Sequence, residues 1–570
     1  MNADSTGREQ AGLAADLRPS LTGIMPIETI DRAMLKAHAR AIVHMRDRLR
    51  DDRLGLILGA GVSKTVGFPT WSELVTRIAK NPRVLGEHLL EGVGSSVSDT
   101  AKTQMLLQHY RTKRLDALGE LSSARVLRKI TGEWRRIVQE ALYEGVPQSA
   151  QKLKDAHPYL RHFIPIVTKS PMTVTYNFDD MVERLIRLER PEREKAYGRS
   201  FETVWNSSLQ PRPGSVVIYH PNGYLPQNLL ENPSDSLVFS EETFADQLIE
   251  SMAGHHASLL HHLSNTTCLL IGLSLADATL RHLLRQSARI NPGQYHYHIT
   301  FLGEDKRRDP VAEDAVRQTN FEVYNLITLF MTNSEIASLG RLLNAEDSEF
   351  RHVAEEEGVE LRFVYYLSGA IGAGKTTVLS YLGSLRTYEE WTEARNELLA
   401  KAWPDLTADE RIEVDDWIMG QFAKKNVALL DRSEGLLVVD RPPLDPLSFS
   451  DESDVAGKSR KMQGAFAPGF SKRKVCMGSV ILLTGEPSEL EARVIGRNKE
   501  SSAPIISDLQ AKLQRIYPEH RVVNTHGASV HEVVHAVSKI VFLEPYKPCD
   551  LAKVLEKLGR EGLPGSDDER

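Results

Sequence analysis

The residues with the clearest chemical meaning form a glycine-rich loop in the second half of the chain. The stretch Gly369-Ala-Ile-Gly-Ala-Gly-Lys375-Thr376 fits the pattern G-x-x-x-x-G-K-[ST] in full and follows the apolar run FVYYL. Backbone N–H groups of such a loop cradle phosphates, the lysine reaches the outer phosphates, and the threonine ligates Mg²⁺. We therefore expect ATP or another nucleotide, with Mg²⁺ on Thr376, in a site formed by Gly369, Gly372, Gly374, Lys375, Thr376 and Thr377.

Two later segments add charged residues to this loop. The apolar run 436–439 ends in Asp440-Arg441, and segment 488–499 carries Arg493 and Arg497 on one helical face. From about residue 361 to residue 545, this layout resembles small P-loop nucleoside and nucleotide kinases. The resemblance implies that Asp440-Arg441 is the strand-end motif and that the later arginines belong to a lid. The alternative for those arginines is a solvated helix face.

A second glycine loop occurs near the start of the chain. The apolar run Leu54–Leu58 is followed by Gly59-Ala60-Gly61 and then by Ser63. Small residues let the backbone approach a pyrophosphate, and the next helix would point its N–H groups toward it. Taken alone, the loop fits a tight strand-to-helix turn without a ligand equally well.

Three further apolar runs end in polar residues. They lead into Thr175-x-Asn177-x-Asp179, into His220-Pro-Asn222-Gly, and into Gly272-x-Ser274 with Asp277 at the next helix start. Ligands of open parallel sheets bind at the carboxyl ends of the strands. We expect these groups to lie together beside the first glycine loop.

In this order, the four segments resemble the sirtuin-like family from about residue 35 to residue 335. The stretches LVFSEETFADQ and IGLSLADATLRHLL are especially similar to bacterial sirtuin-like domains of antiphage defence systems. Those relatives hydrolyse NAD to nicotinamide and ADP-ribose, which the resemblance implies here. The implied NAD-binding residues are Gly59, Ala60, Gly61 and Ser63 at the pyrophosphate, Thr175 at its strand end, and Gly272, Ser274 and Asp277 on the adenosine side.

The resemblance also implies catalytic roles. Asn177 would orient water or the ribose, Asp179 would hold the ribose region or the strand end, and His220 would be a base or a ribose hydroxyl partner. Related chains often carry a catalytic histidine where this chain has Asn222. Asparagine does not accept a proton near neutral pH, so His220 would have to take that role or activity would be weaker.

The cysteine count separates two kinds of sirtuin-like chemistry. The chain has only Cys268, Cys476 and Cys549, with no Cys-x-x-Cys pair. Deacetylating sirtuins usually carry a zinc module built from two such pairs, so we expect no zinc and no deacetylase. Hydrolysis of NAD needs only a held dinucleotide, a stabilised oxocarbenium-like state and a placed water.

These loops must be positioned by two α/β units. We expect an N-terminal Rossmann-like sirtuin-type domain and a C-terminal P-loop nucleotide kinase-like domain, both with parallel sheets flanked by helices. The expected boundaries are 1–30 for a flexible tail, 31–342 for the first domain, 343–360 for a linker, 361–548 for the second domain and 549–570 for a tail.

Composition limits the class of protein. The 570 residues are 41% hydrophobic and 26% charged, with a net charge of −7, as in ordinary soluble globular chains. An acidic chain is a poor candidate for direct nucleic-acid binding. No apolar run is long enough for a membrane span or a signal peptide, so we expect a cytoplasmic protein.

The two halves together suggest an antiphage effector. In this hypothesis, the kinase-like half senses a nucleotide or a phage-encoded trigger and releases NAD hydrolysis, and the family likeness implies a homo-oligomer. The alternative is an active nucleoside or nucleotide kinase whose sirtuin-like half binds NAD as a regulator. A third interpretation has both sites bind their ligands without turnover.

Overall fold

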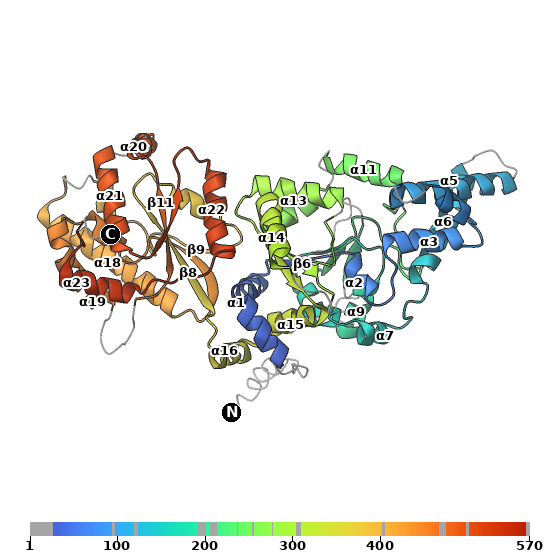
Figure 1. The fold of residues 1–570 in the computed structure, drawn as a ribbon, viewed down its shortest axis with the longest axis horizontal. Coiled ribbons are helices and arrows are strands. Elements are labelled where there is room, and N and C mark those ends of the chain that lie inside the picture. The colour runs from blue at the N-terminus through green and yellow to red at the C-terminus, as the bar shows by residue number, and fades with distance from the viewer. Residues whose placement is uncertain are drawn as a thin grey trace, which may run out of the picture.

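The computed structural model contains two parallel β-sheets flanked by helices (Figure 1). Every pair of named strands runs parallel, which confirms the expected α/β class. The structure describes residues 27–93, 97–118, 124–191, 201–205, 212, 214–235, 237–252, 256–275, 277–303, 309–401, 405–466, 475–496 and 501–565.

The first sheet has seven strands in the order β3-β4-β2-β1-β5-β6-β7. Its strands are β1 (Leu54–Leu58), β2 (Thr173–Thr175), β3 (Glu202–Val204), β4 (Val217–Tyr219), β5 (Thr267–Ile271), β6 (His296–Phe301) and β7 (Leu326–Met331). All five residues of β1 are buried, because β1 lies inside the sheet and helices cover both faces. The chain leaves β1 on one side to form β2 and returns on the other to form β5, so strand order reverses around β1.

Helices in the first half lie before, between and after these strands, and α2 to α8 all lie between β1 and β2. They are α1 (Thr29–Arg50), α2 (Ala60–Lys64), α3 (Trp71–Lys80), α4 (Glu87–Val93), α5 (Asp99–Leu118), α6 (Ala124–Tyr143), α7 (Ala150–Ala156), α8 (Ile164–Val167), α9 (Met181–Glu189), α11 (Glu241–Met252), α12 (Ala257–Asn265), α13 (Ala278–Ile290), α14 (Pro310–Tyr324) and α15 (Asn333–Asn344). Helices α3, α5 and α6 pack on one another at one end of the molecule (Figure 1).

The second sheet has five strands in the order β12-β11-β8-β10-β9. Its strands are β8 (Arg362–Gly369), β9 (Arg386–Tyr388), β10 (Gly435–Asp440), β11 (Ser479–Thr484) and β12 (His520–Asn524). Its helices are α16 (Asp347–Glu356), α17 (Lys375–Tyr381), α18 (Ala408–Leu430), α19 (Val455–Phe466), α20 (Pro487–Ile495), α21 (Ala503–Ile516), α22 (Val530–Phe542) and α23 (Leu551–Glu561). The second glycine loop therefore follows the central strand of its sheet.

Half of the segment expected as a C-terminal tail is a packed helix. Within residues 549–570, Leu551–Glu561 form α23, which packs against α19. Leu551, Leu555 and Leu558 are buried on one face, and this spacing of apolar residues stabilises a helix by packing. The expected linker 343–360 contains α16, with Phe350 and Val353 buried. Helix α1 begins at Thr29, and residues 1–26 of the expected N-terminal tail lie outside the described residues.

Helix α1 lies between the two sheets and contacts both halves (Figure 1). The buried His44 ring is bonded at both nitrogens: its Nε2 donates to the Ser384 carbonyl oxygen at 2.6 Å, and its Nδ1 lies 2.8 Å from the Tyr297 hydroxyl on β6. On the same helix, Asp47 accepts hydrogen bonds of 3.1 and 3.2 Å from the Arg386 guanidinium. The halves are therefore joined by buried polar contacts as well as by chain connectivity.

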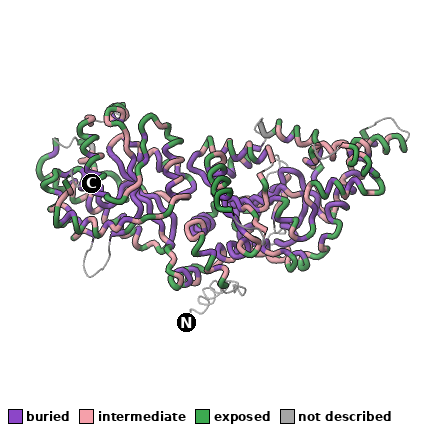
Figure 2. The backbone as a smooth tube through the Cα atoms, in the orientation of Figure 1, coloured by how far each residue is buried: buried purple, intermediate pink, exposed green. Residues whose placement is uncertain are grey.

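Buried backbone is concentrated along the strands of both halves (Figure 2). Cys268, Cys476 and Cys549 are all buried and free. Within the described ranges, no helix combines the length and apolar character needed to cross a bilayer.

Candidate functional site

The first glycine loop interlocks with the loop after β5. The Gly61 N–H donates a 3.0 Å hydrogen bond to the Gly272 carbonyl oxygen, and Gly272 has a φ of +71°. A Cβ on Gly59 would lie 2.5 Å from the Gly272 carbonyl oxygen, and one on Gly272 would lie 2.6 Å from the Val62 nitrogen. Both positions require glycine because a side chain would collide with backbone.

Ser63 joins this loop to the loop after β2. Its hydroxyl donates to the Asp179 carboxylate at 2.8 Å and accepts from the Asn177 amide at 2.9 Å. The same Asn177 amide also donates to the Gly59 carbonyl oxygen at 3.0 Å. The sequence-predicted residues therefore come together, but Ser63 is only 3% exposed and its hydroxyl is already bonded within the protein. Of these three side chains, Asn177 alone is partly exposed.

Asp179 is a buried carboxylic acid with an unusual proton affinity. Burial raises its pKa to about 6, and the neighbouring Asp180 and Glu183 charges act in the same direction. Hydrogen bonds from Ser63 and from the Met181 N–H oppose this rise without cancelling it. Asp179 therefore carries most of its negative charge at neutral pH and loses it in mild acid.

His220 is completely buried in a charge pair that sequence reasoning missed. Its Nε2 lies 2.8 Å from a Glu183 carboxylate oxygen, and its Nδ1 lies 2.8 Å from the Asn177 carbonyl oxygen. Burial alone would lower the pKa of His220, but the Glu183 charge and hydrogen bond outweigh it and raise that pKa. His220 therefore holds the Asn177 backbone in place. The only sequence signal for Glu183 is an acid within an otherwise apolar helical face of α9.

Asn222 stands where related chains often have a histidine, and the structure gives it a different task. Its side chain is buried, donates to the Tyr176 carbonyl oxygen at 3.1 Å and accepts from the Gln247 amide at 3.0 Å. An asparagine can make both bonds at once, because it carries a donor and an acceptor. Asn222 thus fastens α11 to the loop after β2.

The remaining predicted NAD-site residues line the edge of the sheet. Thr175 ends β2 and accepts a 3.3 Å hydrogen bond from the Asn177 N–H. Ser274 is exposed, and Asp277 caps α13 by accepting from the Leu280 N–H at 2.8 Å. Ala60 begins α2, directly after the Gly59 cap. These residues border the interlocked loops: Ala60 and Ser274 are exposed, Asp277 is half-buried and Thr175 is buried.

The second glycine loop has a strained, glycine-dependent backbone. Gly369, Gly372 and Gly374 have φ values of +150°, +85° and +91°, which other residues rarely adopt. The Lys375 ammonium donates back to the Gly369 and Ala370 carbonyl oxygens at 2.8 and 3.1 Å. Burial lowers the pKa of Lys375 to about 8. The Lys375 side chain therefore points into the glycine loop, where bound phosphates would also lie.

The end of β10 lies beside this loop and fits a divalent cation. The Thr376 hydroxyl donates to one Asp440 oxygen at 3.4 Å, while the other Asp440 oxygen is buried without a hydrogen-bond partner in the structure. Hydroxyl, carboxylate and phosphate oxygens are the ligands that Mg²⁺ prefers. Thr376 and Asp440 would hold the ion, which would neutralise charge on bound phosphates. Thr377 follows on α17 and is partly exposed.

A buried charged cluster adjoins Asp440. The predicted Arg441 has a φ of +61° and donates to Glu390 at 2.7 Å and to Asp445 at 3.1 Å. The ammonium of Lys425 on α18 donates to the Asp440 carbonyl oxygen at 2.6 Å, and burial lowers the pKa of Lys425 to about 8. Glu390 and Lys425 were not predicted, because they come from a strand end and a helix that carry no motif.

Of the two arginines predicted to form a lid, the structure describes only Arg493. Arg493 donates to Glu489 at 2.5 Å and to the Thr525 carbonyl oxygen at 2.9 Å, so it is tied to its own helix and to the end of β12. Its helix, α20, packs on the glycine loop, since a Cβ on Gly372 would lie 2.6 Å from the Leu490 carbonyl oxygen. Arg497 lies outside the described residues. In the described part of the chain, no group of three or more His, Cys, Asp or Glu side chains is placed to hold a metal ion.

Residues 171–329 match the SIR2-like domain family. The matched range contains Asn177, Asp179, His220 and Asp277. No curated protein matches the chain. Among solved structures, the NadR protein in complex with NAD and AMP-PNP is similar at 12% identity and a TM-score of 0.24, covering 66% of this chain and 89% of that chain. A TM-score this low does not establish a shared fold. The chain thus contains a SIR2-like domain, a kind of domain that is often an NAD-dependent enzyme.

Proposed function

We propose that the chain hydrolyses NAD to nicotinamide and ADP-ribose where the loops after β1, β2 and β5 meet. The observation that carries this proposal is the placement of Asn177, whose partly exposed amide is fixed by Gly59 and Ser63 at the point where strand order reverses. The SIR2-like match over residues 171–329 supports the same chemistry.

The proposed reaction is a direct attack by water and needs no covalent intermediate with the protein. The oxygen of water bonds to ribose C1′ as the C1′–N bond breaks, nicotinamide leaves neutral with the bonding pair, and the water proton passes to solvent. Asn177 orients the water or the ribose. Asp179, mostly ionised at neutral pH, places negative charge behind Asn177 and favours the positive charge that develops on the ribose. His220 is a positioning residue, since it acts through the Asn177 backbone.

Nicotinamide release from NAD by the purified chain tests this proposal. We expect Asn177→Ala to lower turnover by about a hundredfold or more, because one oriented polar group in an enclosed site supports that much rate. The matched control is Asn265→Ala, which removes an exposed amide on α12. Equal nicotinamide release by wild type and Asn177→Ala under every condition would contradict the proposal.

We propose further that the second half regulates this activity as a nucleotide sensor in an antiphage effector. The complete glycine-loop motif and its neighbour Asp440 support nucleotide binding, and the buried contacts of α1 give the second half a direct path to the first. Cells carrying wild type or Lys375→Ala should differ in NAD loss after phage infection. Identical NAD levels with and without infection would contradict this part of the proposal.

A second candidate function is phosphotransfer by the second half. The observation that favours it is the Glu390–Arg441–Asp445 cluster beside the unpaired Asp440 oxygen, an arrangement with a carboxylate close to a nucleotide-binding loop. Radiolabelled ATP with a panel of nucleosides and nucleotides tests it. Label transfer that Lys375→Ala abolishes, without NAD loss, would make this the better account. Binding of both ligands without turnover would favour two sensor sites.

A further inference from the structure

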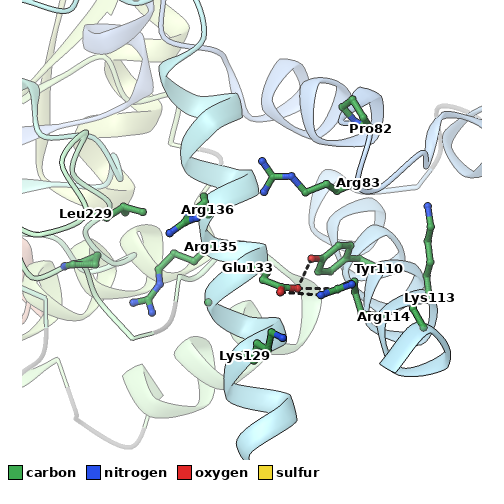
Figure 3. A pocket seen from close by; sticks show the side chains of 13 residues that line it. Pro82, Arg83, Tyr110, Lys113, Arg114, Lys129, Glu133, Arg135, Arg136 and Leu229 are labelled. Carbon is green, nitrogen blue, oxygen red and sulfur yellow. Dashed lines mark hydrogen bonds and ion pairs between the residues drawn. The ribbon is translucent and has the colours of Figure 1, made fainter. Parts of the chain in front are cut away.

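A basic pocket lies outside both glycine loops, at the end of the molecule formed by α3, α5 and α6 (Figure 1). Its volume is about 770 Å³, within the range of pockets that hold small ligands. Figure 3 shows lining side chains on both sides of α6: Arg135, Arg136 and Leu229 lie on one side, and side chains from α5 and from the turn after α3 lie on the other. The six basic residues that line it are Arg83, Lys113, Arg114, Lys129, Arg135 and Arg136.

Positive charge in this pocket is only partly neutralised. The single acidic lining residue is Glu133, which accepts from the Arg114 guanidinium at 2.8 and 2.9 Å and from the Tyr110 hydroxyl at 3.0 Å. Among the described residues, Lys113, Lys129 and Arg136 have no carboxylate within ion-pair distance. We call these three side chains the free cations because none forms an ion pair with a described residue, although the Lys129 charge helps to lower the pKa of Glu133.

The walls of the pocket are held in place by bonds that leave those three cations available. Arg83 is bound by the Glu140 carboxylate at 2.7 and 2.8 Å, and Arg135 donates to the Ser234 carbonyl oxygen at 2.8 Å. The Tyr110–Arg114–Glu133 bonds join α5 to α6 across the base of the hollow (Figure 3). A preformed site loses less entropy on binding than one that must order its side chains.

We propose that this pocket binds a small molecule carrying two or more phosphate groups. Lysine and arginine give charge-assisted hydrogen bonds to phosphate oxygens, and several phosphates would engage the three free cations together. The bounded volume favours a compact ligand over a nucleic-acid strand, which would need a continuous basic track. The site is distinct from the second glycine loop, which lies in the other half of the molecule (Figure 1).

The pocket is also connected to the proposed NAD site through α6. Two turns beyond Arg136, the Tyr143 hydroxyl on the same helix donates to Asp180 at 2.9 Å, next to Asp179. Gln139, between them, donates to the Gln227 carbonyl oxygen at 2.7 Å. A phosphorylated ligand bound to Lys129 and Arg136 would therefore contact a helix whose other end holds the Asp179 loop.

Calorimetric titration with inorganic triphosphate tests the binding. The full-length chain with Lys375→Ala is used, so that the second glycine loop contributes little. We expect Lys129→Gln/Arg136→Gln to weaken binding by about tenfold or more, since it removes two charge-assisted contacts. The matched control is Lys557→Gln/Arg560→Gln, which removes one exposed lysine and one exposed arginine from α23.

Each outcome decides the proposal. Tight triphosphate binding that the pocket variant loses and the control keeps supports it. No triphosphate binding, or an equal loss in both double variants, overturns it. A single-stranded oligonucleotide that binds more tightly than triphosphate and depends on Lys129 and Arg136 would also overturn it, in favour of a nucleic-acid surface. The four positions that distinguish the two double variants are exposed, and both variants carry Lys375→Ala, so any effect of that buried change on folding is common to them.

Discussion

Ser63, Asn177 and Asp179 lie on two different loops, yet their side chains share one set of hydrogen bonds. Sequence reasoning selected all three, because polar residues at the carboxyl ends of parallel strands gather at one edge. It did not show that the Ser63 hydroxyl faces inward, nor that Glu183 pairs with His220. Those facts depend on side-chain direction, which residue spacing does not specify.

The pKa of Asp179 gives a pH prediction for this residue. Because its folded pKa is about 6 and thus above the unfolded value, the folded state gains a proton first as pH falls, and stability rises. From pH 7 to pH 5, this group should add about 1 kcal/mol to the free energy of unfolding, and the gain is lost as pH rises through 6.

Thermal unfolding of wild type and Asp179→Asn at several pH values measures this contribution. Other titrating groups cancel in the difference between the two proteins. The stability of Asp179→Asn relative to wild type should therefore fall as pH is lowered from 7 to 5. A difference that stays constant over this range would show that Asp179 has an ordinary pKa in the folded chain.

At the scale of elements, the loops after β1 and β5 pack directly against each other through their backbones. Gly59 and Gly61 lie against Gly272 so closely that no side chain fits, and the Gly272 backbone has a left-handed φ. The glycines were recognisable in the sequence, but their tight contact was not. The contact exists because β1 and β5 are neighbours in the sheet, which the strand order decides.

We expect Gly272→Ala to destabilise this pair of loops by about 1 to 3 kcal/mol, through backbone strain and collision with Val62. NAD turnover should fall together with thermal stability, because the displaced loop also carries Leu273 and Ser274. The matched control is Gly420→Ala within α18, where an added Cβ meets nothing within 4 Å. That change should stabilise the helix by about 0.5 to 1 kcal/mol. Equal effects of the two changes would contradict the close contact.

At the scale of the whole molecule, the second glycine loop is linked to the first half through a short helix. Helix α17 begins at Lys375, directly after the loop, and ends at Tyr381. A Cβ on Gly293, in the turn before β6, would lie 1.9 Å from the Tyr381 carbonyl oxygen. The Ser384 hydroxyl donates to the Gly293 carbonyl oxygen at 2.8 Å, and the Ser384 carbonyl oxygen accepts from the His44 ring on α1. Movement of the second glycine loop would therefore be passed to β6 through α17 and the turn at Gly293.

Gly293→Ala should separate the two halves, because its Cβ would collide with the backbone at the end of α17. We expect its thermal unfolding to split into two transitions, whereas wild type unfolds with coupled halves. Any effect of nucleotides on NAD turnover should also be lost. Gly457→Ala on α19 has open space at its Cβ position and serves as the control. A single unfolding transition together with intact nucleotide response would exclude this route of communication.

The sequence by itself determined the local features: two glycine loops, the apolar strands before them and the polar residues at strand ends. Each follows from neighbouring residues, because backbone conformation and strand burial depend on short stretches of chain. Tertiary structure alone decided the strand order, the His220–Glu183 pair and the position of α1 between the sheets. His44 and Ser384 are 340 positions apart, and no local pattern specifies contacts over such distances. Packing decides them, because buried polar groups must find partners wherever the fold places them.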